Sequence, residues 1–204
     1  AYNGVSNFDI DSMQLITMVK NMRDEGKFLN GQEITKPPRM FIGAAANPFG
    51  DPHEFRVFRL AKKIVSGADF IQTQCIFNLN RFKAWMEQVR DRGLHEKVYI
   101  LGGITPMKSI GMANYMKNMV PGMDVPDDLI ARIKGVDKDK RADEGIKIAV
   151  ETINEIKTIE GVRGVHIMAI EWEEAVRPIV EQAGLYPRPV VEPPVPVGTE
   201  GAIS

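Results

Sequence analysis

Short apolar runs alternate with segments of helical periodicity along most of this 204-residue chain. Apolar runs predict buried strands over residues 39–48, 70–74, 98–103 and 164–168. The helical segments are expected over residues 11–25, 52–66, 79–92, 108–119, 127–133, 139–159 and 172–183, with Asp11 or Ser12 capping the first. Strands that are apolar on both faces and joined through helices indicate a parallel sheet covered by helices. The sequence therefore predicts an α/β fold.

The number of strands limits the architecture. A closed (β/α)8 barrel has eight strands and typically about 250 residues, whereas four strong strands are visible here. Either the sheet is open or part of the barrel is absent, and because the sequence starts at Ala1 with a helix that would normally follow a strand, we expect an N-terminal truncation. We expect residues 1–185 to form part of one domain and residues 186–204 to form a proline-rich extended tail.

Charge and cysteine content exclude several classes of function. The chain has 26 lysines and arginines against 27 aspartates and glutamates, so no net charge favours nucleic acid or an anionic membrane as a partner. One cysteine and three histidines provide neither a disulfide framework nor a zinc site from this chain alone. The apolar runs are far shorter than the roughly 20 residues of a membrane span. We expect a cytoplasmic protein.

Two segments near the first predicted strand have the residue types of a ligand site. Small side chains over residues 43–48 end a strand where ligands bind in parallel α/β folds, and they would let a flat ring approach the backbone. The alternative is that these alanines pack under a helix. Arg56, Arg59 and Lys63 share one helical face and could hold a phosphate, and the alternative is a solvated basic face.

The second predicted strand ends in polar residues. Gln72 and Gln74 should point to one side of the sheet and Thr73 to the other, because side chains alternate along a strand. A buried amide needs a hydrogen-bonding partner, which a heterocyclic substrate would provide. Gln74 is the better candidate because it is nearest the strand end. Cys75 has no evident base in the sequence, which argues against a cysteine nucleophile.

The helix after the glycine-rich strand end at residues 102–106 has a methionine stripe. Such stripes usually belong to the core, and we expect this of Met119. Met112 and Met116 can be either core residues or a pliable wall against a flat ligand.

The last predicted strand and the residues after it are also open to two interpretations. His166 is expected to be a core histidine with a backbone partner, and a site role is the alternative. Glutamates around Trp172 are consistent with a charge set at a helix N-terminus and need not be catalytic.

Several of these segments together resemble the methylenetetrahydrofolate reductase family. The resemblance covers the chain from Asp9 to Ala183 and rests on residues 41–48, 62–74, 101–106, 120–122, 125–127 and 164–168. It implies a TIM barrel of which this chain supplies roughly the second half, the last four strands of eight. It also implies a flavin, FAD or FMN, that passes a hydride to methylenetetrahydrofolate and yields 5-methyltetrahydrofolate in one-carbon metabolism.

The resemblance assigns roles to individual residues. Ala45 and Asn47 would lie against the flavin, while Arg59 and Lys63 match positions that contact its phosphates. Gln74 matches a glutamine that bonds the folate pterin and faces the nicotinamide donor. Met112 and Met116 would line the substrate site. The family's catalytic glutamate lies on the first four strands, so no catalytic residue and no metal ligand is assigned here, and the chain alone should be inactive.

Three departures from the family pattern refine this expectation. Arg56 stands where some members have an acidic flavin contact, Met116 replaces a folate-contacting aromatic, and Trp172 replaces an arginine for the folate glutamate tail. They resemble an acetogen-type branch, in which electrons come through an iron-sulfur or zinc partner subunit. NAD(P)H is the alternative electron source, and an oligomer is expected. The alternatives are a non-catalytic half-barrel scaffold and another flavin- or phosphate-binding TIM-barrel enzyme.

Overall fold

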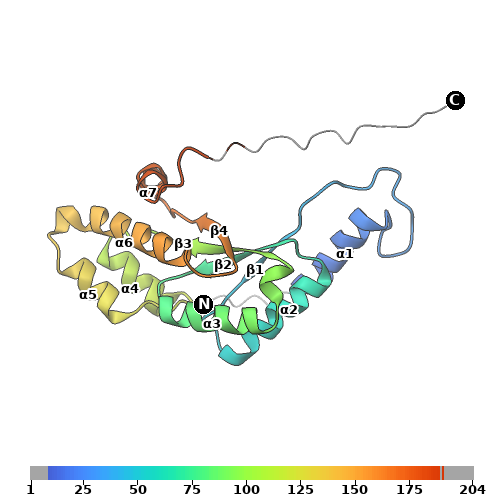
Figure 1. The fold of residues 1–204 in the computed structure, drawn as a ribbon, viewed down its shortest axis with the longest axis horizontal. Helices are drawn as coiled ribbons and strands as arrows, with labels where there is room; N and C mark the ends of the chain where they lie inside the picture. The colour runs from blue at the N-terminus through green and yellow to red at the C-terminus, as the bar shows by residue number, and fades with distance from the viewer. Residues whose placement is uncertain (1–8, 189, 191–204) are drawn as a thin grey trace.

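Four parallel strands form the centre of the computed structural model, which describes residues 9–188 and 190 (Figure 1). The strands β1 (Gly43–Ala46), β2 (Phe70–Cys75), β3 (Tyr99–Ile104) and β4 (Val162–Ile167) lie side by side in their sequence order. Every pair of neighbours is parallel. The predicted α/β class with a parallel sheet is therefore confirmed.

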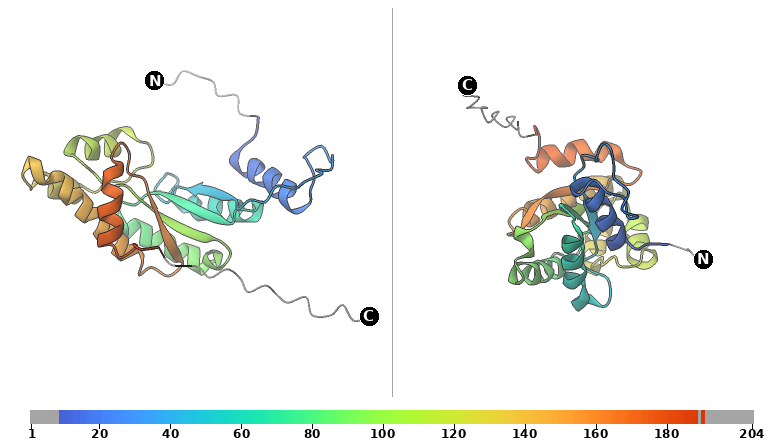
Figure 2. Two further views of the ribbon diagram at one scale, coloured as in Figure 1. Left: turned by 90° about the horizontal axis from the view of Figure 1, so that it is seen from above. Right: turned by 90° about the vertical axis from the view of Figure 1, so that its right-hand side faces the viewer.

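Helices connect and flank these strands. They are α1 (Ser12–Asp24), α2 (Arg56–Ser66), α3 (Leu79–Asp91), α4 (Ile110–Met119), α5 (Asp127–Lys134), α6 (Arg141–Ile156) and α7 (Val176–Gln182). Single 3-10 turns precede α2, α6 and α7, and a further one follows α3. Figures 1 and 2 show α1 at one end of the molecule and α5 with α6 at the opposite end. None of the described helices is both long and apolar enough for a membrane span.

The ends of two helices follow from local sequence. Asp11 caps α1, because its carboxylate accepts from the backbone N–H groups of Met13 and Gln14 while the Gln14 side chain accepts from the N–H of Asp11. This confirms the predicted cap. Helix α2 ends at Gly67, whose φ of 117° lies in the left-handed region that favours glycine.

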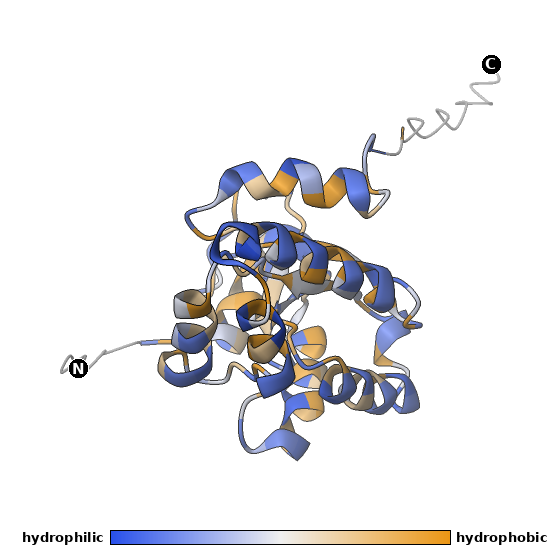
Figure 3. Ribbon diagram, turned by 90° about the vertical axis from the view of Figure 1, so that its left-hand side faces the viewer, coloured by the Kyte–Doolittle hydropathy of each residue, from blue (hydrophilic) through white to orange (hydrophobic). Residues whose placement is uncertain are grey.

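The main core lies between the sheet and the helices that follow its strands. Ile71 and Ile100 of the sheet pack against a cluster that includes Phe82, Trp85 and Ile153, all of them fully buried. A second cluster around Met107, Met116 and Ile133 lies beneath α4 and α5. The helices show both hydrophilic and hydrophobic colours around their circumference in Figure 3, as expected for amphipathic helices with one buried face.

The opposite face of the sheet is poorly covered in the described part of the chain. In β2 the side chains of Ile71, Thr73 and Cys75 are buried, whereas those between them are only half-buried. On this face Phe41 stacks on Phe70 with ring centroids 5.4 Å apart, yet Phe41 is 62% exposed. Parallel sheets are normally covered on both faces.

The structure differs from the sequence prediction in several elements. The strand expected over residues 39–48 is reduced to β1, which is half-exposed because it pairs only with β2 among the described residues and borders the uncovered face. Met119 was expected in the core but is 67% exposed, since it is the last residue of α4 and a helical stripe is buried only where another element covers it.

Other boundaries shift by a few residues. Ser109 caps α4, so that helix begins at Ile110 rather than near Lys108. The helix expected over residues 172–183 begins with a 3-10 turn at Glu173–Ala175 and becomes α-helical at Val176. The extended tail expected over residues 186–204 lies mostly outside the described residues.

Candidate functional site

Two neighbouring cavities open at the carboxyl ends of the strands. The smaller, about 200 Å³ in volume, will be called the cationic recess and is lined by Ala45, Ala46, Asn47, Arg56, Arg59, Leu60, Lys63 and Gln74. Its walls come from the end of β1, the side of α2 and the end of β2. The residues predicted for cofactor binding, Ala45, Asn47, Arg59 and Lys63, are thus brought together.

The larger cavity, about 610 Å³, will be called the methionine cavity. It is lined by Gln74, Cys75, Lys108, Ser109, Met112, Tyr115, Met116, Val120, Met123, Met168, Ile170 and Glu171. Most of these side chains are apolar and come from α4 and from the segment after β4. Pliable thioether side chains adapt to a flat ligand, so Met112 and Met116 occupy the wall that the sequence allowed for them.

Gln74 lines both cavities. It lies on the poorly covered side of β2 with Gln72, while Thr73 is buried on the other side, as the alternation predicted. The Gln72 amide bonds to His166, whereas the Gln74 amide bonds to no described residue. Its donor and acceptor are therefore available to a ligand in either cavity.

The three cations of the recess differ in their availability. Arg56 donates to the backbone carbonyls of Gly50 and Asp51, so its guanidinium holds the loop before α2 rather than facing the recess freely. Lys63 donates to the carbonyl of Ala45 at 2.5 Å. Burial lowers the pKa of the Lys63 ammonium below its usual value, and the nearby charge of Arg59 lowers it further. A bound anion would favour the protonated ammonium and so raise the pKa of Lys63 again.

Asn47 has a structural role as well. Its amide nitrogen donates to the carbonyl of Gly122 at 3.2 Å, and its amide oxygen accepts from the backbone N–H of Phe49 at 2.9 Å. These bonds tie the end of β1 to the segment after α4. The remaining lone pair and N–H of the amide stay available to a ligand.

His166 was expected to have a backbone partner, and this expectation is wrong. Its Nδ1 lies 3.2 Å from Nε2 of Gln72, two strands away across β3. Both side chains are half-buried on the poorly covered face of the sheet. With the Gln72 amide donating, the imidazole proton is on Nε2.

Cys75 is buried, and its Sγ lies 2.9 Å from Oγ1 of Thr105. Burial raises the pKa of the thiol above its usual value. A protonated thiol is a poor nucleophile, which agrees with the prediction made from its sequence context. In the described part of the chain, no group of three or more histidine, cysteine or acidic side chains is arranged to hold a metal ion.

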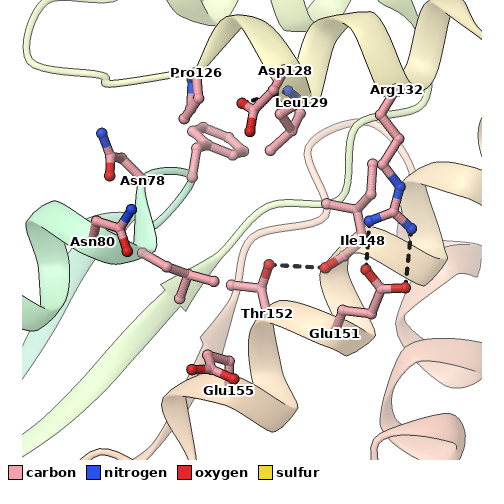
Figure 4. Close-up of a pocket in the computed structure, with 12 residues that line it drawn as sticks. Asn78, Asn80, Pro126, Asp128, Leu129, Arg132, Ile148, Glu151, Thr152 and Glu155 are labelled. Atoms are coloured by element: carbon pink, nitrogen blue, oxygen red, sulfur yellow. Dashed lines mark hydrogen bonds and ion pairs between the residues drawn. The ribbon is translucent and has the colours of Figure 1, made fainter.

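A third cavity, of about 520 Å³, lies among α3, α5 and α6 (Figure 4). Three of its four charged side chains are already in ion pairs, because Arg132 donates to both carboxylate oxygens of Glu151 and Glu155 pairs with Lys83. The fourth, Asp128, accepts from the backbone N–H of Leu129. It is on the helix side rather than at the strand ends, where ligands bind in parallel α/β folds. We therefore do not assign it as the functional site.

Two residues of the methionine cavity were not assigned to a site from the sequence. Lys108 lies four residues after the end of β3, and its Nζ lies 5.5 Å from the centroid of the Trp172 ring. Glu171 has a φ of 51°, which is uncommon for a residue other than glycine. Their position four residues after the end of a strand was the available sequence signal.

The fold and the two cavities define an α/β protein with a candidate ligand site at the carboxyl ends of parallel strands. A cation-lined cavity and a mostly apolar cavity meet there at Gln74. The family described as Methylenetetrahydrofolate reductase matches residues 11–184. The chain belongs to this family.

Related proteins agree with this assignment. Methylenetetrahydrofolate reductase 1 of Schizosaccharomyces pombe is 29% identical over 152 residues, which cover 71% of this chain and 24% of the yeast protein. Methylenetetrahydrofolate reductase 2 of Saccharomyces cerevisiae is 28% identical over 131 residues, covering 63% of this chain and 21% of that protein. The chain thus spans about a quarter of the length of these curated relatives.

A solved structure resembles the fold. It is described as an uncharacterized protein from Clostridium thermocellum that binds two copies of 5-methyl-5,6,7,8-tetrahydrofolic acid. The TM-score is 0.55 with 14% sequence identity, and the match covers 81% of this chain and 67% of that one. At this identity the likeness establishes the fold alone.

Proposed function

We propose that this chain forms part of a flavin-dependent enzyme that reduces 5,10-methylenetetrahydrofolate to 5-methyltetrahydrofolate. The observation that carries the proposal is the position of Gln74 in the wall of both cavities, with an amide that bonds to no described residue. A group in this position can orient a folate against a neighbouring cofactor. Family membership supports the same reaction, and the structural neighbour, which binds 5-methyl-5,6,7,8-tetrahydrofolic acid, is consistent with a folate ligand.

The cationic recess fits the phosphate end of a flavin, FAD or FMN. Arg59 and Lys63 supply positive charge, and the half-buried ammonium of Lys63 gains the counter-ion that it lacks among the side chains of the recess. Ala45 is exposed on the poorly covered side of β1, where its small side chain permits close approach of a ring. The bound flavin would supply hydride chemistry, while these residues hold and orient it.

The methionine cavity fits the pterin and aminobenzoate rings of a folate. Met112 and Met116 form an apolar wall, and Gln74 provides an amide donor and acceptor for the polar edge of the pterin. Holding the two reacting rings in one orientation lowers the entropic part of the barrier. The residues of this chain thus act by positioning, and the catalytic acid is proposed to lie outside it.

The poorly covered sheet face supports a closed barrel in the complete protein. Phe41 and Tyr99 are 62% and 56% exposed there, and further strands of a (β/α)8 barrel would bury them. We therefore propose that the present strands are the last four of eight.

The electron donor, assembly and cellular setting are proposals as well. Two departures from the family pattern favour the acetogen-type branch: Trp172 stands in place of an arginine, and Arg56 stands in place of an acidic flavin contact. In this branch an iron-sulfur or zinc partner subunit would replace NAD(P)H as the source of electrons, within a cytoplasmic oligomer.

Gln74→Ala tests the proposed function in the full natural polypeptide that carries this sequence. We expect folate turnover to fall by about tenfold or more, as for loss of a positioning hydrogen bond, while the flavin content measured by absorbance changes little. Gln88→Ala is the matched control, because Gln88 belongs to α3 and lines neither of the two cavities. Equal losses of turnover and flavin would show that Gln74 is structural.

A second candidate function is a non-catalytic half-barrel scaffold, which the exposed aromatic side chains of the sheet face favour. In that case a partner protein rather than further strands would cover Phe41 and Tyr99. Flavin absorbance separates the two candidates, because the natively purified scaffold would be colourless.

A further inference from the structure

Buried hydroxyl groups are rare in this protein, and they lie in one place. Among residues with a hydroxyl, amide or charged side chain, the described part of the chain buries two, Thr73 and Thr105, which are 3% and 5% exposed. Burial of a hydroxyl costs free energy unless its hydrogen bonds are made. Thr73 precedes Gln74 in β2, and Thr105 contacts Cys75, the residue that follows it. The two buried hydroxyls thus flank Gln74 at the end of its strand.

The end of β2 is also irregular in its backbone. Two residues of β2, Thr73 and Gln74, stand opposite one residue of β3, Gly102, because the register between the strands shifts there. A bulge of this kind disrupts the ladder of backbone hydrogen bonds locally, and it is a common way to change the direction of a side chain next to an active site. The ladder alone therefore defines the position of Gln74 less strictly than that of a residue in a regular strand.

The Thr73 hydroxyl joins the two strands at this bulge. It donates to the carbonyl oxygen of Gln74 at 3.0 Å and accepts from the backbone N–H of Gly103 at 2.8 Å. One buried oxygen atom thus connects the backbone of Gln74 to β3. Neither bond uses the Gln74 amide, so the backbone is held while the side chain stays available to a ligand.

We propose that Thr73 is a positioning residue of the enzyme, whose hydroxyl holds the bulge of β2 and thereby the Gln74 amide between the cationic recess and the methionine cavity. This inference rests on the proposed function, in which Gln74 orients the folate. Thr73 lines neither cavity, so it acts through Gln74 rather than on a ligand.

Loss of the hydroxyl should move Gln74 without unfolding the strand. Valine has nearly the shape of threonine, so the packing around position 73 is kept. The buried N–H of Gly103 would lose its acceptor, however, and an unsatisfied buried donor is costly enough to make the backbone shift. A misplacement of about 1 Å can slow a reaction between bound groups by about a hundredfold, so a residue outside the cavities can control turnover.

Two substitutions separate the hydroxyl from packing in the full natural polypeptide that carries this sequence. For Thr73→Val we expect kcat for reduction of 5,10-methylenetetrahydrofolate to fall by about tenfold, while the flavin content measured by absorbance changes little. Thr73→Ser keeps the hydroxyl and loses a buried methyl group. It should lower the midpoint of thermal unfolding by roughly 2–4 °C and keep kcat within about threefold of the wild type.

Thr152→Val is the matched control. Its hydroxyl donates to the carbonyl of Ile148 within α6, and the residue lines neither cavity. The same change from threonine to valine should therefore leave kcat unaltered at this position.

A double-mutant cycle tests whether Thr73 acts through Gln74. In the Gln74→Ala background, Thr73→Val should lower kcat by less than about twofold, because the amide that it positions is absent. An equal loss in both backgrounds would overturn the inference, as would wild-type turnover in Thr73→Val or a Thr73→Ser variant as slow as Thr73→Val. In each of these cases the wild type still turns over, so the proposed function stands. If the wild type neither binds flavin nor reduces the folate, the proposed function and this inference both fail.

Discussion

Gly103 connects the packing of the sheet to the position of Gln74. It lies in β3 next to the end of β2, where its N–H donates to Oγ1 of Thr73 at 2.8 Å and its carbonyl accepts from the N–H of Ile76 at 2.9 Å. An ideal Cβ on Gly103 would lie 2.4 Å from the carbonyl oxygen of Thr73 and 2.7 Å from that of Gln74. Both atoms belong to the backbone, so no side chain can rotate away.

Gly103→Ala should therefore displace the end of β2. Relief of the contact needs a backbone shift of roughly half an ångström or more, and overpacking of this kind costs about 1–3 kcal/mol. For a complete barrel domain of about 250 residues, each kcal/mol lowers the midpoint of thermal unfolding by roughly 2–4 °C. We expect a decrease of about 4–8 °C at a cost near 2 kcal/mol, accompanied by weaker folate binding because Gln74 moves with the strand.

Circular dichroism of the full natural polypeptide would measure the midpoint. Gly111→Ala is a matched control, because this glycine is in the exposed first turn of α4 and an added Cβ meets only Ser109 Oγ at 3.7 Å. Replacing glycine with alanine inside a helix gains up to about 1 kcal/mol, so its midpoint should stay or rise. A Gly103→Ala variant as stable as Gly111→Ala would refute the reasoning.

Two further predictions concern titratable groups. Lys63→Met should weaken flavin binding by about tenfold. The affinity of the wild type for flavin should fall as pH rises from 7 toward about 10, because phosphate binds the protonated ammonium and the pKa of Lys63 is lowered. A flavin affinity that does not change with pH, or a pH dependence that persists in Lys63→Met, would contradict this. Folding raises the pKa of the Cys75 thiol. The stability that the protonated thiol contributes is therefore complete below the pKa of an unfolded thiol, about 8.5, and is lost as pH rises through the pKa of the folded protein. Thermal midpoints measured across this range should fall more steeply in the wild type than in Cys75→Ala, and parallel curves would show that the thiol is not the cause.

Local sequence patterns predicted the helices and strands well, and also the face of the strand or helix on which each side chain lies. The alternation of Gln72, Thr73 and Gln74 and the shared face of Arg56, Arg59 and Lys63 follow from the geometry of a single strand or helix. Which face another element covers is not a local property. Met119 illustrates this. It belongs to the methionine stripe as predicted, but it is the last residue of α4 and remains exposed.

The partners of polar groups depended on contacts that the sequence does not display. Arg56 was expected to help hold a phosphate, but the conformation of the loop at Gly50 and Asp51 brings two carbonyls to its guanidinium. His166 reaches Gln72 across β3, in a part of the sheet where both strand pairs shift in register, between Gln72 and Cys75 and between Ile100 and Leu101. A single strand's sequence does not show such a shift.

Gln74 could be identified as a candidate from the sequence, but the two cavities around it could not. Its amide near the end of an apolar strand predicted a polar site, since a buried amide requires a partner. The irregularity between Gln72 and Cys75 sets the end of β2 relative to Gly103, and Gln74 consequently lies between a cationic recess and a methionine cavity. This arrangement needs a glycine at position 103, because a Cβ there would meet the backbone carbonyls of Thr73 and Gln74. Gly103 of β3 thus sets the position of Gln74 in β2, and the sequence of β2 alone cannot show this.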